Sequence, residues 1–210
     1  MNVNYVKENY DTQASVRGML AYMINRQILN TVNTMMVVRV TAVDAGGASS
    51  PTGYVDAQPL VTQYDGQNSM VRMPELYKLP YSRIQGGKCA LVIDPEVGDL
   101  GIAVFAQYDT QNITKDTTEQ ELPATLMPYP MHCGWYIGGF LNKIPETFIE
   151  LTQDDGLNIT SPNGITIKAE NGITIDAPTV TVTGDVIASG ISLVTHTHGG
   201  CMGGSTGTPS

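Results

Sequence analysis

The chain has 210 residues, enough for one large domain or two small ones with a buried core. Its formal net charge is -9, with 11 scattered Lys and Arg residues against 20 Asp and Glu. Binding to nucleic acid needs clustered basic side chains, so this balance argues against a nucleic-acid partner. No stretch has the roughly 20 apolar residues of a membrane span. No signal peptide is expected, and three widely spaced cysteines fit no disulfide framework, so we expect folding in the cytosol.

Residues 12–33 carry apolar side chains at near-helical spacing, from Val16 and Met19 to Ile28. The spacing predicts one amphipathic helix, and we assign residues 1–32 to an N-terminal helical segment. We expect this helix to dock on the side of the following domain or on a partner subunit. A membrane-surface helix is the alternative, but its polar face lacks the basic residues typical of such helices.

Residues 33–150 have the pattern of a β domain. Short runs rich in β-branched residues are separated by Gly- and Asp-containing turns. The predicted strands are 35–44, 53–65, 88–95, 99–109 and the segment around 135–141. About five short strands indicate a small closed barrel, with the OB-fold as the leading candidate. The same pattern is compatible with a β-sandwich.

Residues 151–194 consist of short self-similar units. Three eight-residue units, GLNITSPN, GITIKAEN and GITIDAPT, follow one another from Gly156, and TVTVTGDVIASGISL continues the theme. Two apolar residues at i and i+2 point to one side of a strand, and a dipeptide such as Asn-Gly then turns the chain. The apolar pairs at this spacing are Leu157/Ile159, Ile165/Ile167, Ile173/Ile175, Val180/Val182 and Ile191/Leu193, and Val186/Ile187 is a further pair of adjacent residues. Periodic short strands predict a β-helix, in which each unit buries its apolar face by stacking on neighbours.

The number of these strands predicts the oligomeric state. One chain offers about five, too few to close several coils of three strands each. Three chains wound around one axis would bring their Ile and Val rows together on that axis. We therefore expect an intertwined, obligate homotrimer.

The segment 195–210 contains two histidines, His196 and His198, followed by a Gly-rich tail. At i and i+2 on an extended strand, both imidazoles face the same way. In a threefold trimer, six imidazole nitrogens would then surround one point. Six nitrogen ligands suit an octahedral ion such as Fe(II), one per trimer, whereas zinc normally takes four ligands. The alternative is that both histidines are simply solvated.

The sequence thus predicts a mainly β fold: an N-terminal helix, an OB-fold-like barrel, and an intertwined trimeric β-helix needle with a metal-capped tip. The run APTVTVTGDVIASGISLVTHTHGG resembles the needle tip of the central spike proteins of contractile-tailed phages. The runs GYVDAQPLV, LPYSRIQGG, ALVIDPEVGDLGIAVFA and YIGGFLNKIPE are similar to the N-terminal domain of the same family. The resemblance spans residues from about 35 to 200.

This resemblance implies a structural protein of the virion, at the tip of the tail baseplate. Such a spike caps the tail tube, docks on the tail hub, and is driven through the host outer membrane when the sheath contracts. His196 and His198 match the two histidines that family members use to bind an iron ion in the trimer. Cys201 departs from the family pattern, which has an aliphatic residue there. We interpret Cys201 as a packed small side chain, with a contact to the metal as the alternative.

Other functions are less well supported by the residues. Some β-helix proteins degrade carbohydrates with paired carboxylates, and Asp154/Asp155 and Asp94/Glu96 form pairs here, but in turn-like segments. His132 and Cys133 are adjacent, and adjacent residues on a strand point apart, which argues against a catalytic pair. An OB-fold that binds oligonucleotides or sugars would present exposed aromatic residues on a basic face. Candidate aromatic residues are present at Tyr54, Tyr64, Tyr77 and Tyr81, but the charge of the chain has the wrong sign. We therefore expect no enzyme and no small-molecule substrate. The spike tip of a bacterial contractile injection system is the closest alternative.

Overall fold

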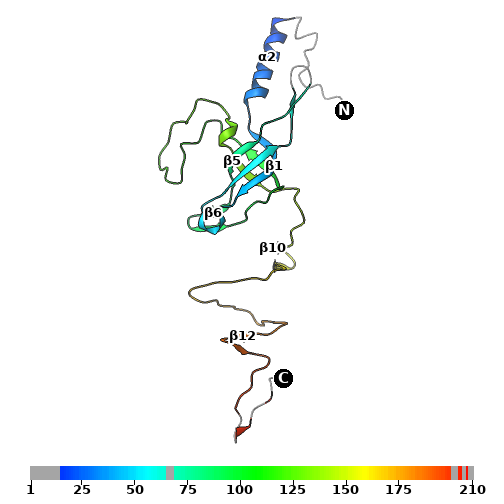
Figure 1. Cartoon of the computed structure of the whole chain (residues 1–210), viewed down its shortest axis with the longest axis vertical. Helices are drawn as coiled ribbons and strands as arrows, with labels where there is room; N and C mark the ends of the chain where they lie inside the picture. Colours follow the sequence, from blue (N-terminus) through cyan, green and yellow to red (C-terminus); the bar gives the residue numbers. More distant parts are fainter. Residues whose placement is uncertain (1–14, 65–68, 200–202, 205–206, 208–210) are drawn as a thin grey trace. The chain divides into compact units, whose positions relative to one another are not determined.

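The computed structural model describes residues 15–64, 69–199, 203–204 and 207 (Figure 1). The chain divides into two compact units, Met1–Pro145 and Glu146–Ser210, and each is described by itself. The described residues are mainly β, with one N-terminal helix and one curled half-barrel sheet. The predicted boundary between residues 150 and 151 falls inside strand β10 (Phe148–Thr152) of the second unit.

Helix α2 (Val16–Thr31) forms within the predicted segment 12–33, whose first three residues lie outside the described part. It begins at Ser15, whose Oγ accepts a hydrogen bond from the Gly18 N–H at 3.1 Å. A serine in this position satisfies one of the helix's unpaired N–H groups. The larger apolar side chains of α2 are all exposed in the single chain. None of the described helices is long and apolar enough to cross a membrane.

A five-stranded antiparallel sheet forms the head, which is our name for the first unit. Its strands are β1 (Met35–Asp44), β2 (Tyr54–Pro59), β5 (Leu76–Pro80), β8 (Leu100–Val104) and β9 (Trp135–Gly138). They lie side by side in the order β5-β2-β1-β8-β9. The sheet curls so that its two edge strands approach each other: Tyr81, just after β5, forms a parallel bridge with Tyr136 on β9. The Ser82 N–H also donates to the Tyr136 carbonyl at 2.8 Å.

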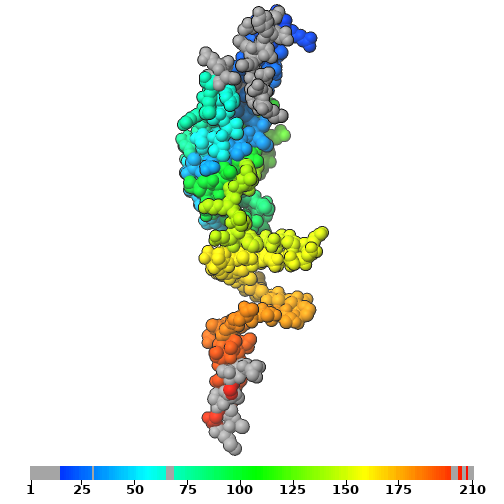
Figure 2. Space-filling view, turned by 90° about the vertical axis from the view of Figure 1, so that its right-hand side faces the viewer, coloured from blue at the N-terminus to red at the C-terminus, as the bar shows by residue number. Residues whose placement is uncertain are grey.

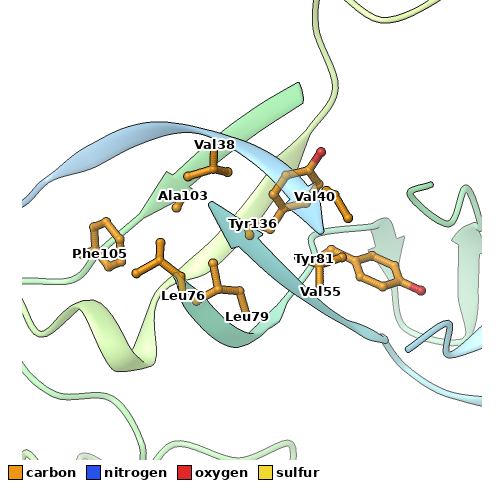
Figure 3. Packing of buried hydrophobic residues seen from close by; sticks show 10 residues of the cluster. Val38, Val40, Val55, Leu76, Leu79, Tyr81, Ala103, Phe105 and Tyr136 are labelled. Carbon is orange, nitrogen blue, oxygen red and sulfur yellow. The ribbon is translucent and has the colours of Figure 1, made fainter. Parts of the chain in front are cut away.

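The core of the head lies inside this curl (Figure 3). On β1, Val38 and Val40 are buried and the residue between them is exposed, as the period of two in a strand requires. The other buried hydrophobic residues are Val55, Ala57, Leu76, Leu79, Tyr81, Ala103, Phe105 and Tyr136. They come from all five strands or from residues directly following them. The core is therefore made entirely within one chain.

Four of the five predicted strands correspond to sheet strands. The range predicted for β1 agrees with the structure, and β2, β8 and β9 lie within their predicted ranges. The remaining predicted strand, 88–95, contains β7 (Cys89–Leu91), which pairs with β6 (Ile84–Gly86) in a separate hairpin instead. The fifth strand of the sheet, β5, was not predicted.

The remaining elements of the head are short. They are the 3-10 helix η1 (Gly47–Ser49), the strand pair β3 (Gln63–Tyr64) and β4 (Met70–Val71), and the 3-10 helix η2 (Met131–Cys133). The connection from β8 to β9 is long, and η2 is its one regular element. We call residues 105–134 the long loop.

The second unit contains two hairpins. Strand β10 pairs with β11 (Gly156–Thr160), in a register that places Ile149 opposite Ile159 and Leu151 opposite Leu157. These four residues share one face because positions two apart on a strand lie on the same side. Near the C-terminus, β12 (Ile187–Ala188) pairs with β13 (Ile191–Ser192). No described residue of this unit is buried.

Between the hairpins, residues 161–184 form no helix or strand in the single chain. The predicted strands at Ile165–Ile167 and Ile173–Ile175 therefore lack strand pairing here. Among the described residues, no backbone–backbone hydrogen bond involves this stretch. Figures 1 and 2 show this stretch, in yellow to orange, as extended chain.

The eight-residue period is visible in the backbone of the second unit. Gly156, Gly164 and Gly172 all have positive φ angles, of 72°, 92° and 94°. Glycine adopts such angles without the steric cost that a Cβ brings. Each of the three follows an Asp or Asn residue at a turn. The repeat seen in the sequence thus corresponds to a repeated turn of the chain.

Candidate metal centre

The segment with the two predicted metal ligands follows the second hairpin. Ser189 and Gly190, both with positive φ, make the turn between β12 and β13. Beyond the paired strands, the Leu193 N–H donates to the Val186 carbonyl at 2.9 Å. The chain that leads to the histidines is thereby held against the hairpin.

Asp185 forms hydrogen bonds to the residues that follow the turn. Its carboxylate accepts hydrogen bonds from the Ser192 hydroxyl and from backbone N–H groups, including that of Val194 at 3.2 Å. The Ser192 hydroxyl is the largest cause that lowers the pKa of Asp185, and the backbone donors add to it. Hydrogen bonds to the ionised form favour that form, so Asp185 is an ionised cap for the segment.

The imidazole of His196 is oriented by backbone carbonyls. Its Nδ1 lies 2.9 Å from the Ser192 oxygen and 3.0 Å from the Leu193 oxygen. A carbonyl accepts only from a protonated nitrogen, so Nδ1 carries a hydrogen, and in the neutral tautomer of this kind the lone pair is on Nε2. Metal-binding histidines typically donate their second ring N–H to such a partner, which fixes the tautomer. The residues present therefore fit a metal ligand at His196 Nε2.

The second imidazole lies close to the first. The ring centroids of His196 and His198 are 5.0 Å apart and the rings are nearly perpendicular, at 87°. The structure brings the two predicted ligands together, although residues 196–198 form no strand in the single chain. One chain supplies only two imidazoles here, so a complete coordination shell would need further ligands. Cys201, the alternative contact, lies outside the described residues.

The carboxylate pairs considered for catalysis are engaged in structural contacts or exposed at a turn. Asp94 Oδ1 accepts from Arg83 at 2.8 Å and from the Tyr81 hydroxyl at 2.5 Å. The Tyr81 hydrogen bond, followed by the Arg83 interactions, holds the pKa of Asp94 below its ordinary value. The side chain of Arg83 is buried, and it also donates to the carbonyls of two residues in the η1 region. Asp154 and Asp155 lie in the exposed β10–β11 turn.

The expectation for His132 and Cys133 was wrong in its structural premise. They lie on the 3-10 helix η2, not on a strand, and their ligand atoms approach those of Asp109. The sequence contains no signal for this cluster, because Asp109 is 23 positions from His132 and no periodicity links them. No protein-family model and no curated protein matches the chain significantly.

Proposed function

We propose that this protein is the trimeric central spike of a contractile phage tail, and that its second unit is one third of a β-helical needle. The observation that carries the proposal is the exposure of the apolar pairs: each of the twelve residues is between 41% and 70% exposed in the single chain. Exposed apolar area of this extent marks an interaction surface, so we expect the row of apolar pairs to be covered by other chains.

The unpaired backbone of residues 161–184 supports the same proposal. Peptide N–H and C=O groups beside an apolar face need hydrogen-bond partners once water is excluded from that face. Neighbouring strands from two identical chains would supply these partners and would cover the apolar rows at the same time. Turns repeated at Gly156, Gly164 and Gly172 give each chain the regular progression that such winding needs.

The energy available from trimerisation is large. Fully burying one Val, Leu or Ile side chain contributes roughly 1.5–3 kcal/mol, so covering the exposed half of twelve of them contributes on the order of 10 kcal/mol per chain. Ordering the chain opposes this gain. A single chain has no comparable gain within the described residues of the unit, since none of them is buried. An obligate trimer accounts for this imbalance.

We propose that the head is an OB-type barrel that serves as the collar of the spike. The OB-fold is a five-stranded, partly open Greek-key barrel. The order β5-β2-β1-β8-β9 supports this assignment, together with the bridge between Tyr81 and Tyr136 that links the two edges. The collar would dock on the tail hub or tail tube, and the exposed apolar side chains of α2 are available for that contact or for another subunit.

We further propose that His196 and His198 from three chains hold one iron ion at the tip. The orientation of His196 by two carbonyls supports a ligand role, and six imidazole nitrogens would suit an octahedral ion. When bound, the ion would cross-link the three chains where the apolar pairs have ended. Zinc or another divalent metal is the less favoured alternative.

In this role the protein works mechanically: it caps the tail tube in the virion and pierces the host outer membrane when the sheath contracts. No catalytic step is proposed, because Asp94 is neutralised by Arg83 and the Asp154/Asp155 pair is in an exposed turn. The spike tip of a bacterial contractile injection system would have the same physical features. A carbohydrate-binding or carbohydrate-degrading β-helix is the remaining alternative.

Sedimentation of the purified chain at micromolar concentration, combined with elemental analysis, tests the proposal. The expected result is a trimer with one iron per three chains, lost in a His196→Ala/His198→Ala double variant that remains trimeric. A stable monomer would refute the needle. A trimer with three metal ions bound at these histidines, or with none, would refute the shared ion alone.

A further inference from the structure

Three side chains with metal-ligating atoms converge at the two ends of the long loop. Asp109 lies near its start, and His132 and Cys133 lie on η2 near its end. His132 Nε2 is 3.2 Å from Asp109 Oδ2, and the ligand atoms of all three residues lie within 4.8 Å of one another. The cluster belongs to the head and involves neither of the histidines at the tip.

The carboxylate of Asp109 is buried without a permanent cation. Its side chain has no exposed surface, and Asp109 is the one carboxylate residue among the described residues that is buried as a whole. Its Oδ1 accepts from the Gln111 N–H at 3.0 Å and its Oδ2 from the Thr125 hydroxyl at 2.8 Å. Its ion-pair partner among the described residues is His132, which is charged only when protonated. Buried charges are ordinarily paired or bound to a metal, so a divalent cation would complete this arrangement.

The far end of the long loop carries exposed apolar residues. Loops of more than about 12–15 residues without secondary structure are uncommon in compact domains. Leu122 is 83% exposed and Leu126 is 96% exposed, so the apolar residues at its far end do not anchor it. Asp109 and His132 are 23 positions apart, and a metal that joins the ends of a loop this long removes much conformational freedom from the unfolded chain.

We propose that Asp109, His132 and Cys133 form a zinc site that clips the long loop of the head. A carboxylate oxygen, an imidazole nitrogen and a thiolate are all established zinc ligands. Zn–N and Zn–O bonds of about 2.1 Å in tetrahedral geometry place the two ligand atoms roughly 3.4 Å apart, and the observed distance is 3.2 Å. Zinc would replace the His132–Asp109 hydrogen bond, and the hydrogen of His132 Nε2 would move to Nδ1 through solvent so that the Nε2 lone pair binds the metal. Water would take the fourth position.

The surrounding contacts suit this site. The Gln111 N–H and the Thr125 hydroxyl would keep the Asp109 carboxylate in place, as outer partners of metal ligands do. Cys133 Sγ donates at present to the Pro130 carbonyl at 3.6 Å. On binding, the thiol would release its proton to solvent and the thiolate would bind the metal.

Zinc titration of the full-length chain tests the proposal. The protein is stripped with a chelator under reducing conditions and refilled with zinc, in the His196→Ala/His198→Ala background so that the tip does not contribute. One zinc per chain is expected. Cys133→Ser should weaken binding by more than the roughly 10–100-fold cost of losing an outer partner. Cys89→Ser is the matched control, because this exposed cysteine lies on β7 outside the cluster, and it should bind as before.

Cobalt absorption spectra and trypsin digestion distinguish a loop held by zinc from a loop held by hydrogen bonds alone. Cobalt-loaded protein should show a thiolate charge-transfer band that Cys133→Ser abolishes and Cys89→Ser retains. Lys115 is an exposed residue of the long loop, and trypsin cleaves after lysine. Zinc should slow this cleavage at least tenfold in the Cys89→Ser variant and should leave its rate unchanged in Cys133→Ser. Circular dichroism confirms that both variants fold. Stoichiometric zinc without the thiolate band, or equal binding by the two cysteine variants, would overturn the proposal.

Discussion

Replacing one apolar residue of the repeat measures directly whether the second unit is buried by other chains. Ile173 is 58% exposed in the single chain. Ile173→Ala removes three carbon groups, each worth about 0.8 kcal/mol when buried, and 58% of that burial would come from neighbouring chains. The expected loss is roughly 1.4 kcal/mol per chain, or about 4 kcal/mol per trimer, before any cavity cost. A residue that stays in water would change stability by no more than about 0.5 kcal/mol.

Thr174 provides the matched control, because the next residue along a strand points to the opposite side. Thr174→Ala should leave stability nearly unchanged. The assay is the fraction of trimer that survives stepwise heating in detergent, together with denaturant unfolding at fixed chain concentration. Equal, small effects of Ile173→Ala and Thr174→Ala would refute the reasoning that the apolar rows face the trimer axis.

Three further predictions address the turns, the core and the buried ion pair. Gly172→Ala should lower the free energy of unfolding of the trimer by about 1–2 kcal/mol per chain, because its φ of 94° is in the left-handed region. Gly184→Ala is the control: its φ is not positive and no atom lies within 4 Å of an added Cβ, so the thermal midpoint of the trimer should not change. Gly101→Ala should destabilise the head by about 1–3 kcal/mol or more, because an added Cβ would lie 2.3 Å from the buried Tyr136 ring. The measurement is the thermal midpoint of the head, and Gly86→Ala is the control, because an added Cβ there has no neighbour within 4 Å. The lowered pKa of Asp94, caused first by Tyr81 and then by Arg83, gives stability that is present above the unfolded pKa of about 3.9 and is lost as pH falls through the lower folded pKa. Head unfolding followed from pH 6 to pH 2 should therefore show acid destabilisation that is reduced in Asp94→Asn, and an unchanged pH profile would contradict the role of this pair.

The sequence predicted most accurately those features in which local pattern and tertiary burial agree. Strand β1 has its predicted range because Val38 and Val40 alternate with exposed residues. Strand β5 was missed because its five residues include Lys78, with a φ of 54°, and end at Pro80, which cannot donate to a neighbouring strand. Both features are tolerated at the edge of the sheet, where β5 lies.

The two candidate metal sites differ in how far the sequence could reveal them. His196 and His198 are two positions apart at the end of the repeat, and their spacing together with that position predicted a shared site. The tautomer of His196 could not be predicted, because it depends on carbonyls that the turn after β13 brings to Nδ1. Asp109 and His132 are close only because the two ends of the long loop lie together, and no local sequence pattern predicts that the ends meet.

The head buries apolar residues within one chain, whereas the apolar pairs of the second unit are exposed, so the proposed trimer predicts that the two units respond differently to dilution. The head has its core within one chain, from Val38 to Tyr136, so its unfolding is expected to be independent of protein concentration. The second unit has no buried described residue, so in the proposed trimer its order would depend on other chains and would weaken as the protein is diluted. In that trimer, each substitution at an inward position would also act three times. A melt with one concentration-independent transition and one concentration-dependent transition would therefore separate the two units without any substitution.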